Sequence, residues 1–392
     1  MDSSADETVD GEDGGGEDAP ERVFRERTDR VQAAMADANA DLLALFPSSN
    51  LQYLTGFEES PAERHLFLFV AREGDPVAVV PALYETQVRA ESWLADVRAY
   101  TDSEAPLAVV REALAALGVD GTGSPHVLVD DSMWATFTQD LRGLLPAASW
   151  GLASEAVGPV RMRKDDAEVD ALRRAGAVAD AVSEWVRARG ADVVGLTEAE
   201  LAAEIERELR ERGASGVSFP VIVGSGPNGA MPHHTHGDRE IARGDPVVLD
   251  FGGVVDDYPG DQTRTVVFAG DPPEAFERVH DVVHDALEAG VAAVEPGVEA
   301  QAVDTAAREV IADAGYGDAF VHRTGHGVGV DVHEPPYIVE GNDRELEPGM
   351  VFSVEPGVYL ADRFGVRIED LVVVTDDGCE RLNDSPRRWQ SP

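Results

Sequence analysis

Two carboxylates in the segment 247–268, VVLDFGGVVDDYPGDQTRTVVF, have the clearest potential for chemistry. Asp250 ends a short apolar run typical of a buried strand, and Asp261 lies between the turn-rich DDYPG and a second strand-like run. This pattern predicts a bent hairpin that brings the two side chains together. An unpaired buried carboxylate costs on the order of several kcal/mol, and Arg264 is the only cation in the segment. A bound metal cation is therefore the expected counter-charge.

A second pair of carboxylates, Glu355 and Glu369, lies in strand-like runs further along the chain. In VFSVEPGVYL, Pro356 and Gly357 end the strand directly after Glu355. In VRIED, Arg367 and Glu369 share one strand face, because alternate side chains of a strand point the same way. A buried Arg367–Glu369 ion pair explains Glu369 as well as a metal does, but it leaves the other three acids without a partner.

Three histidines, His322, His326 and His333, surround a glycine-rich bend in HRTGHGVGVDVHEPP. The glycines allow the backbone to turn tightly, so that the imidazoles can approach a common point. Four carboxylates and one imidazole are enough to hold two divalent cations. Oxygen-rich ligands without thiolates favour Mn, Fe, Co or Zn over copper or iron–sulfur clusters. The pattern therefore predicts a functional metal site.

The apolar pattern of residues 160–392 predicts a scaffold in which one arrangement occurs twice. Each half is expected to contain two helices and then a pair of strands that carries two of the acids. The helices are expected over 164–190, from a capping box at Thr197 and Glu200 to Gly213, over 273–292 and over 299–314. Strands are expected at 350–355 and 366–374. The repeated order indicates an internal duplication of architecture.

The first part of the chain predicts a separate α/β domain over residues 21–155. Helices are expected over 23–38, 106–117 and 134–145, and strands over 41–46, 65–70, 76–80 and 126–130. No cluster of histidines, cysteines or carboxylates stands out here, which suggests an architectural role or one in closing over the other half. Residues 1–20 are acidic and nearly free of large apolar side chains, so a disordered tail is predicted.

The composition indicates a soluble protein of a salt-rich cytoplasm. The formal net charge is −43, and Lys164 is the only lysine. Such a surface repels nucleic acid, and the self-repulsion is screened at about 1 M salt, as in extreme halophiles. One cysteine, Cys379, excludes an intrachain disulfide, and no apolar run approaches the roughly 20 residues of a membrane span. A cytoplasmic location without membrane or nucleic-acid partners is therefore expected.

The motifs DFGGVVDDYPGDQTRT, GHGVGVDVHEPP, SVEPG and VRIED resemble the metal motifs of the M24 metallopeptidases. These enzymes share the "pita-bread" fold, which contains an internal pseudo-twofold duplication. NLQYLTGF, at 50–57, is similar to the creatinase-type N-terminal domain of the proline-specific branch. The resemblance implies an Xaa-Pro dipeptidase or Xaa-Pro aminopeptidase that cleaves peptides with proline in second position through metal-activated hydroxide. Members of this family are often homodimers.

The resemblance also implies the roles of individual residues. Five of them match the ligands of two divalent metals, with Mn or Co the expected ions and Zn or Fe possible: Asp250, Asp261, His326, Glu355 and Glu369. Glu355 matches the residue that accepts a proton from water and passes it to the departing amine. Residues His233, His322 and His333 match catalytic and substrate-side histidines, and Arg367 matches an arginine linked to the substrate carboxylate. His234 and His236 have no match.

Three other functions remain open from the sequence. GSGPNG at 224–229 fits a dinucleotide-binding fingerprint, although Pro232 stands where the phosphate-binding helix should begin. A metal-dependent amidohydrolase of the same fold, acting on a small solute, and a non-catalytic binding protein are the others. Within the peptidase interpretation, the pairing of Arg367 with a C-terminal carboxylate favours dipeptides over longer substrates.

Overall fold

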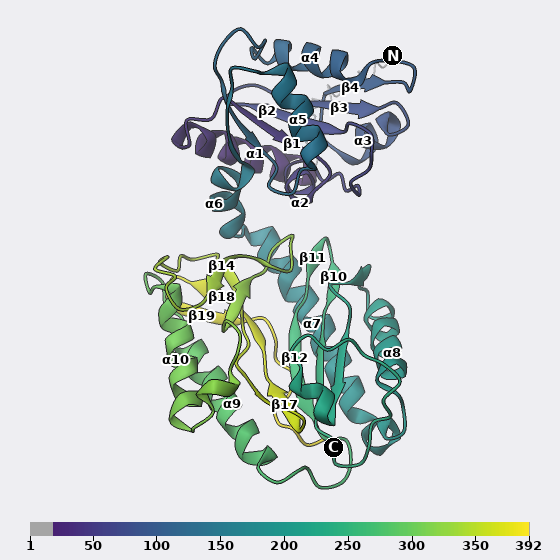
Figure 1. Ribbon diagram of the computed structural model, residues 1–392, viewed down its shortest axis with the longest axis vertical. Helices are drawn as coiled ribbons and strands as arrows, with labels where there is room; N and C mark the ends of the chain where they lie inside the picture. Colours follow the sequence, from purple (N-terminus) through teal and green to yellow (C-terminus); the bar gives the residue numbers. More distant parts are fainter. Residues whose placement is uncertain (1–18, 392) are drawn as a thin grey trace, which may run out of the picture. The chain divides into compact units, whose positions relative to one another are not determined.

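A computed structural model of the chain describes residues 19–391 (Figure 1). They form two compact units, which are divided between Val160 and Arg161. The predicted acidic tail lies outside the described residues except for 19 and 20, with which helix α1 (Ala19–Asp37) begins. Near the boundary between the two units the chain forms the short helix α6 (Val157–Met162). No helix within residues 19–391 is both long and apolar enough to cross a membrane.

The first unit is built on a mixed six-stranded sheet in the order β4-β3-β2-β1-β5-β6. Its strands are β1 (Leu42–Leu45), β2 (Phe67–Ala71), β3 (Val77–Pro81), β4 (Asp96–Tyr100), β5 (His126–Val129) and β6 (Ser149–Leu152). Helices α4 (Pro106–Ala116) and α5 (Ala135–Leu144) pack apolar side chains against one face of the sheet. Side chains of α2 (Ser49–Thr55) and α3 (Glu85–Glu91) lie beside Leu68 and Val80 of the strands. The predicted α/β domain is confirmed.

In the second unit, two helices precede the hairpin that carries Asp250 and Asp261. Helix α7 (Asp166–Ala188) is followed by α8 (Glu198–Glu211), which begins with the expected capping box. The Thr197 hydroxyl accepts a hydrogen bond from the amide of Glu200, and the Glu200 carboxylate accepts one from the amide of Thr197. The strands that follow are β7 (Gly216–Val217), β8 (Ile222–Ser225), β9 (Val247–Phe251), β10 (Gly253–Val255), β11 (Tyr258–Pro259) and β12 (Gln262–Val266).

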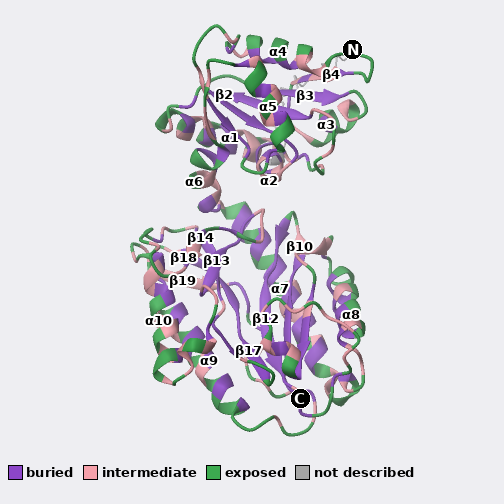
Figure 2. Cartoon of the chain, in the orientation of Figure 1, coloured by how far each residue is buried: buried purple, intermediate pink, exposed green. Residues whose placement is uncertain are grey.

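The same order then repeats. Helices α9 (Phe276–Ala292) and α10 (Ala300–Asp313) precede the remaining strands, β13 (Gly325–Gly327), β14 (Glu334–Ile338), β15 (Val351–Val354), β16 (Gly357–Leu360), β17 (Phe364–Arg367), β18 (Asp370–Thr375) and β19 (Gly378–Arg381). Helices α9 and α10 cover one side of the strands, and α7 and α8 the other (Figure 1). Figure 2 shows that the strands are largely buried while the helices expose one side. The predicted duplication of architecture is confirmed.

One local expectation is wrong, and the objection to a dinucleotide site is supported. The single strand expected at 366–374 is interrupted at Ile368 and Glu369, between β17 and β18. There the Glu369 amide donates to the Thr263 carbonyl, so a backbone hydrogen bond joins the two halves of the unit at this point. The glycines of GSGPNG allow close packing: a Cβ on Gly224 would lie 3.1 Å from the Gly229 Cα, and one on Gly226 would lie 2.8 Å from Arg239 Nη2. A 3₁₀ turn follows β8 instead of the helix that a dinucleotide site requires.

Candidate metal centre and the cavity around it

The hairpin of β9 and β12 brings Asp250 and Asp261 together, as expected. In the register of the two strands Thr263 lies opposite Asp250, and Gln262 lies opposite Phe251. The turn closes tightly because Gly252 has no side chain: a Cβ there would lie 1.7 Å from the Gly260 carbonyl oxygen. Both carboxylates consequently lie on the same side of the hairpin and line one cavity.

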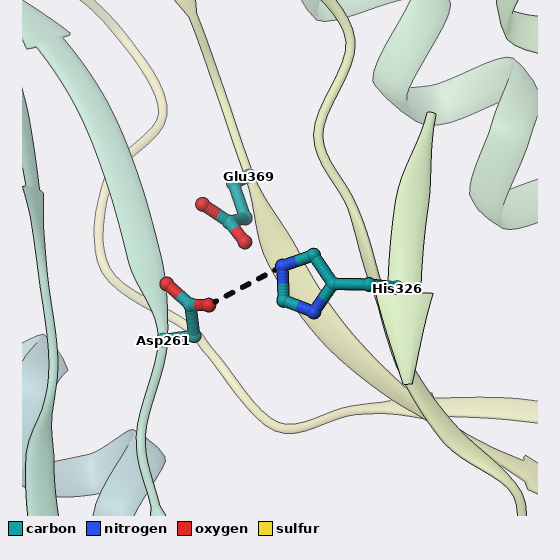
Figure 3. Close-up of side chains that lie close together, drawn as sticks. All are labelled: Asp261, His326 and Glu369. Carbon is teal, nitrogen blue, oxygen red and sulfur yellow. Dashed lines mark ion pairs between the residues drawn. The ribbon is translucent and has the colours of Figure 1, made fainter. Parts of the chain in front are cut away.

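Asp261, His326 and Glu369 come from three separate segments and meet at one point (Figure 3). One potential ligand atom of each lies within 4.8 Å of those of the other two, and all three residues are buried. His326 Nε2 is 3.7 Å from Asp261 Oδ2 and 3.4 Å from Glu355 Oε1. His326 Nδ1 lies 3.2 Å from the Gly327 carbonyl oxygen. Donation of the Nδ1 proton to that carbonyl leaves the Nε2 lone pair facing the carboxylates.

The charges of this cluster are poorly compensated by the protein itself. Burial, followed by repulsion from neighbouring carboxylates, raises the pKa values of Asp261 and Glu369 well above their usual range. Burial also raises the pKa of Glu355 to about 7 and lowers that of His326 to about 3. A neutral imidazole and several crowded carboxylates form a donor set suited to a divalent cation.

Neither Arg264 nor Arg367 forms an ion pair with Asp261 or Glu369. Arg264 is directed to the other side of its strand, where it forms an ion pair of 2.9 Å with Asp370. Arg367 pairs with Asp250 at 2.6 Å, so the ion pair weighed for Arg367 and Glu369 does not form. Thr263 Oγ1 instead lies between them, 3.1 Å from Arg367 Nε and 2.6 Å from Glu369 Oε2.

Two buried carboxylate oxygens of the cavity indicate that a cation binds here. Within residues 19–391, Asp250 Oδ1 and Glu369 Oε1 are buried and have no hydrogen-bond partner. Buried polar atoms are rarely left in this state without a functional reason. Divalent metal ions fit these oxygens, because each offers a lone pair that no protein donor uses.

The cavity has a volume of about 300 Å³ and is lined by all nine residues singled out from the sequence. They are Asp250, Asp261, His233, His322, His326, His333, Glu355, Arg367 and Glu369. One wall is apolar and contains residues 219–222, Phe-Pro-Val-Ile. The cavity thus combines a polar, carboxylate-rich end with an apolar surface, which is typical of a small-molecule site.

A chain of hydrogen bonds runs from Asp250 to His322 and includes a residue that the sequence did not indicate. Arg367 Nη1 donates to the Tyr359 hydroxyl at 2.8 Å, and that hydroxyl lies 2.9 Å from His322 Nε2. His322 Nδ1 lies 2.7 Å from the Arg323 carbonyl oxygen. Burial lowers the pKa of His322 to about 4 and raises that of Tyr359 to about 12, so both groups are neutral. The only sequence signal for Tyr359 was its place in the strand after Glu355.

The structure also gives partners to the two histidines that the sequence left unassigned. His234 Nε2 lies 2.7 Å from the fully buried carboxylate of Glu198, and His236 Nδ1 lies 2.7 Å from the Val221 carbonyl oxygen. Both imidazoles line the cavity. Their orientation is therefore set by the protein, while each retains a second ring nitrogen.

The fold and this site define the class of protein. The chain belongs to metallopeptidase family M24, whose model matches residues 170–376, and residues 27–163 match the Creatinase/Prolidase N-terminal domain. The predicted family and enzyme class are confirmed: the protein is a metal-dependent hydrolase of the peptidase type, with divalent metal ions as its cofactor.

Individual relatives are similar along almost the whole chain. The Xaa-Pro dipeptidase of Lactobacillus helveticus is 36% identical over 363 residues, which are 92% of this chain and 97% of that protein. The crystal structure of dipeptidase PepE from Mycobacterium ulcerans is 41% identical, with a TM-score of 0.87 and coverage of 95% and 98%. Prolidase from Thermococcus sibiricus is 37% identical, with a TM-score of 0.88 and coverage of 96% and 100%.

Proposed function

We propose that this protein is a dinuclear exopeptidase that hydrolyses the bond between an N-terminal residue and proline. Asp250, Asp261, His326, Glu355 and Glu369 would hold the two cations, with Mn or Co the expected ions. The observation that carries this proposal is the convergence of these side chains in one cavity beside buried carboxylate oxygens without protein partners. Relatives named Xaa-Pro dipeptidase and prolidase support the substrate class.

Two divalent cations in such a site supply hydroxide at neutral pH and polarise the scissile carbonyl. The protein contributes the proton transfer. Glu355, whose Oε1 also accepts a hydrogen bond of 3.2 Å from Ser353 Oγ, would take the proton of the attacking water and pass it to the departing amine.

The histidines at the cavity wall would orient the substrate and stabilise the developing oxyanion. The His333 ring lies 4.2 Å from the His326 ring, measured between centroids, so it is next to the reacting end of the cavity. His322 is held through Tyr359 and would act as a neutral group. The apolar wall at residues 219–222 offers a surface for the proline ring, which has no N–H to donate.

Preference for dipeptides requires a cation for the C-terminal carboxylate. Arg367, the residue that the resemblance implied, already donates to Asp250, Tyr359 and Thr263. Arg323 also lines the cavity; its guanidinium lies 4.3 Å from the Tyr337 ring centroid, and no described carboxylate lies within ion-pair distance of it. Arg323 is therefore the second candidate for this role.

A length series tests the proposed activity. Ala-Pro, Ala-Pro-Ala and a pentapeptide with proline second are assayed with Mn²⁺ or Co²⁺ in molar KCl, with Ala-Ala as the control. We expect Ala-Pro to be cleaved fastest and Arg367→Ala or Arg323→Gln to reduce that advantage. Equal rates for Ala-Ala and Ala-Pro would exclude proline specificity, and equal rates for all three proline peptides would exclude the dipeptidase preference. A homodimer and a cytoplasmic location remain predictions.

A further inference from the structure

The only lysine of the chain is completely buried. Apart from the histidines, every other basic residue is an arginine, yet the Lys164 side chain is 0% exposed. Its ammonium lies 2.6 Å from Glu334 Oε1 and 3.5 Å from the Met162 carbonyl oxygen. A buried ammonium is costly unless it is paired, so Lys164 and Glu334 depend on each other.

The Glu334 carboxylate is held on three sides. Lys164 takes one oxygen, and Arg161 Nη2 takes the other at 2.5 Å while also binding Asp331 at 2.7 Å. The backbone of Gly329 packs against the same group, since a Cβ there would lie 2.3 Å from Glu334 Oε1. The loop from Gly329 to Glu334 therefore packs around the Glu334 side chain.

Glu334 is close in sequence to His333 and close in the sheet to His326. Glu334 directly follows His333 and begins β14, and in the strand pairing it lies opposite Gly327, the neighbour of His326. Any shift of Glu334 therefore moves the backbone that carries the His333 ring. The two cationic side chains that bind Glu334, Arg161 and Lys164, lie at the start of the second unit. They are distant in the sequence from the residues that line the cavity.

We infer that Lys164 and Arg161 are positioning residues, which set the place of the His333 imidazole through Glu334. The inference rests on the proposed function in one respect, the action of His333 on the substrate. A compact ammonium reaches Glu334 in a fully enclosed space, whereas the larger planar guanidinium of an arginine would have to displace its neighbours.

The test compares Lys164→Met with the matched control Arg163→Met. Arg163 is the adjacent residue and forms an ion pair of 2.9 Å with Glu347, but both side chains are about half exposed. Each variant is assayed for metal content, for kcat and KM on Ala-Pro well below its melting temperature, and for the NMR signal of the His333 ring in the metal-free protein. That signal is identified by its loss in His333→Ala.

We expect Lys164→Met to keep its metal, to move the His333 signal and to lower kcat by roughly ten- to a hundredfold, with KM changed far less, since small misplacements cost rates of this size. Arg163→Met should match the wild type in all three measurements. A purely structural ion pair would lower the melting temperature of Lys164→Met while leaving kcat per metal-loaded molecule and the His333 signal unchanged. That result would overturn the inference.

If Lys164→Met does not fold, Glu334→Gln decides by the same measurements, because it keeps the shape of the side chain and removes only its charge. A wild-type protein that cleaves no Xaa-Pro peptide would refute the proposed function. The NMR comparison would still decide whether Lys164 positions His333, so the two failures are distinguishable.

Discussion

Removing the metal from this protein should leave a fold whose stability falls as the pH rises. In the metal-free state burial raises the pKa of Glu355 from 4.5 to about 7, and those of Asp261 and Glu369 rise in the same direction. At a pH between the unfolded and the folded pKa of such a group, the folded protein retains a proton that the unfolded chain has released. Rising pH therefore favours the unfolded state, and stability is greatest below the unfolded pKa.

The size of the effect follows from the shift. A rise in the pKa of Glu355 from 4.5 to about 7 corresponds to a loss of about 3 kcal/mol in the free energy of unfolding as the pH rises across this interval. Metal binding should act in the opposite sense, because it requires the ionised carboxylates. One ion at about 1,000 times its dissociation constant adds about 4 kcal/mol. For a unit of this size that is roughly 8–16 °C in melting temperature.

Thermal unfolding measured between about pH 5 and pH 8 in molar KCl tests this, since salt screens the general charge of the chain. The wild type and Glu355→Gln are compared after chelation and after addition of Mn²⁺, with Glu347→Gln as the exposed control. The chelated Glu355→Gln protein should lack much of the pH-dependent loss. The reasoning would be refuted if the melting temperatures of the chelated wild type and Glu355→Gln changed in parallel with pH and Mn²⁺ did not change the melting temperature at neutral pH.

Four further outcomes are expected. Stability should rise with KCl into the molar range, because salt screens the net charge of −43; a flat or falling melting temperature would contradict this. His233→Ala and His333→Ala should keep their metal, measured by elemental analysis, and lose roughly 10²–10³ in kcat. Tyr359→Phe should also keep its metal and lower kcat, because it breaks the link between Arg367 and His322. An amine-reactive reagent should modify Lys164 only after unfolding, as mass spectrometry can show, since its side chain is 0% exposed.

Local features of this protein could be predicted from the sequence alone. The hairpin that joins Asp250 and Asp261 follows from apolar runs and turn residues within a short segment, and the start of α8 follows from the capping box at Thr197. These features depend on interactions between residues near in the chain, which the sequence displays directly. The family motifs then implied roles for further cavity residues, His326, Glu355 and Glu369 among them.

Partners distant in the chain were decided only by the tertiary structure. Arg367 bonds Asp250, 117 positions away, instead of the nearby Glu369, and Lys164 bonds Glu334, 170 positions away. Tyr359 joins the site because β16 pairs with β17 and so brings its hydroxyl beside Arg367. A side chain's hydrogen bonds depend on which strands and helices pack around it, and that packing arises only when the two halves of the second unit close on each other.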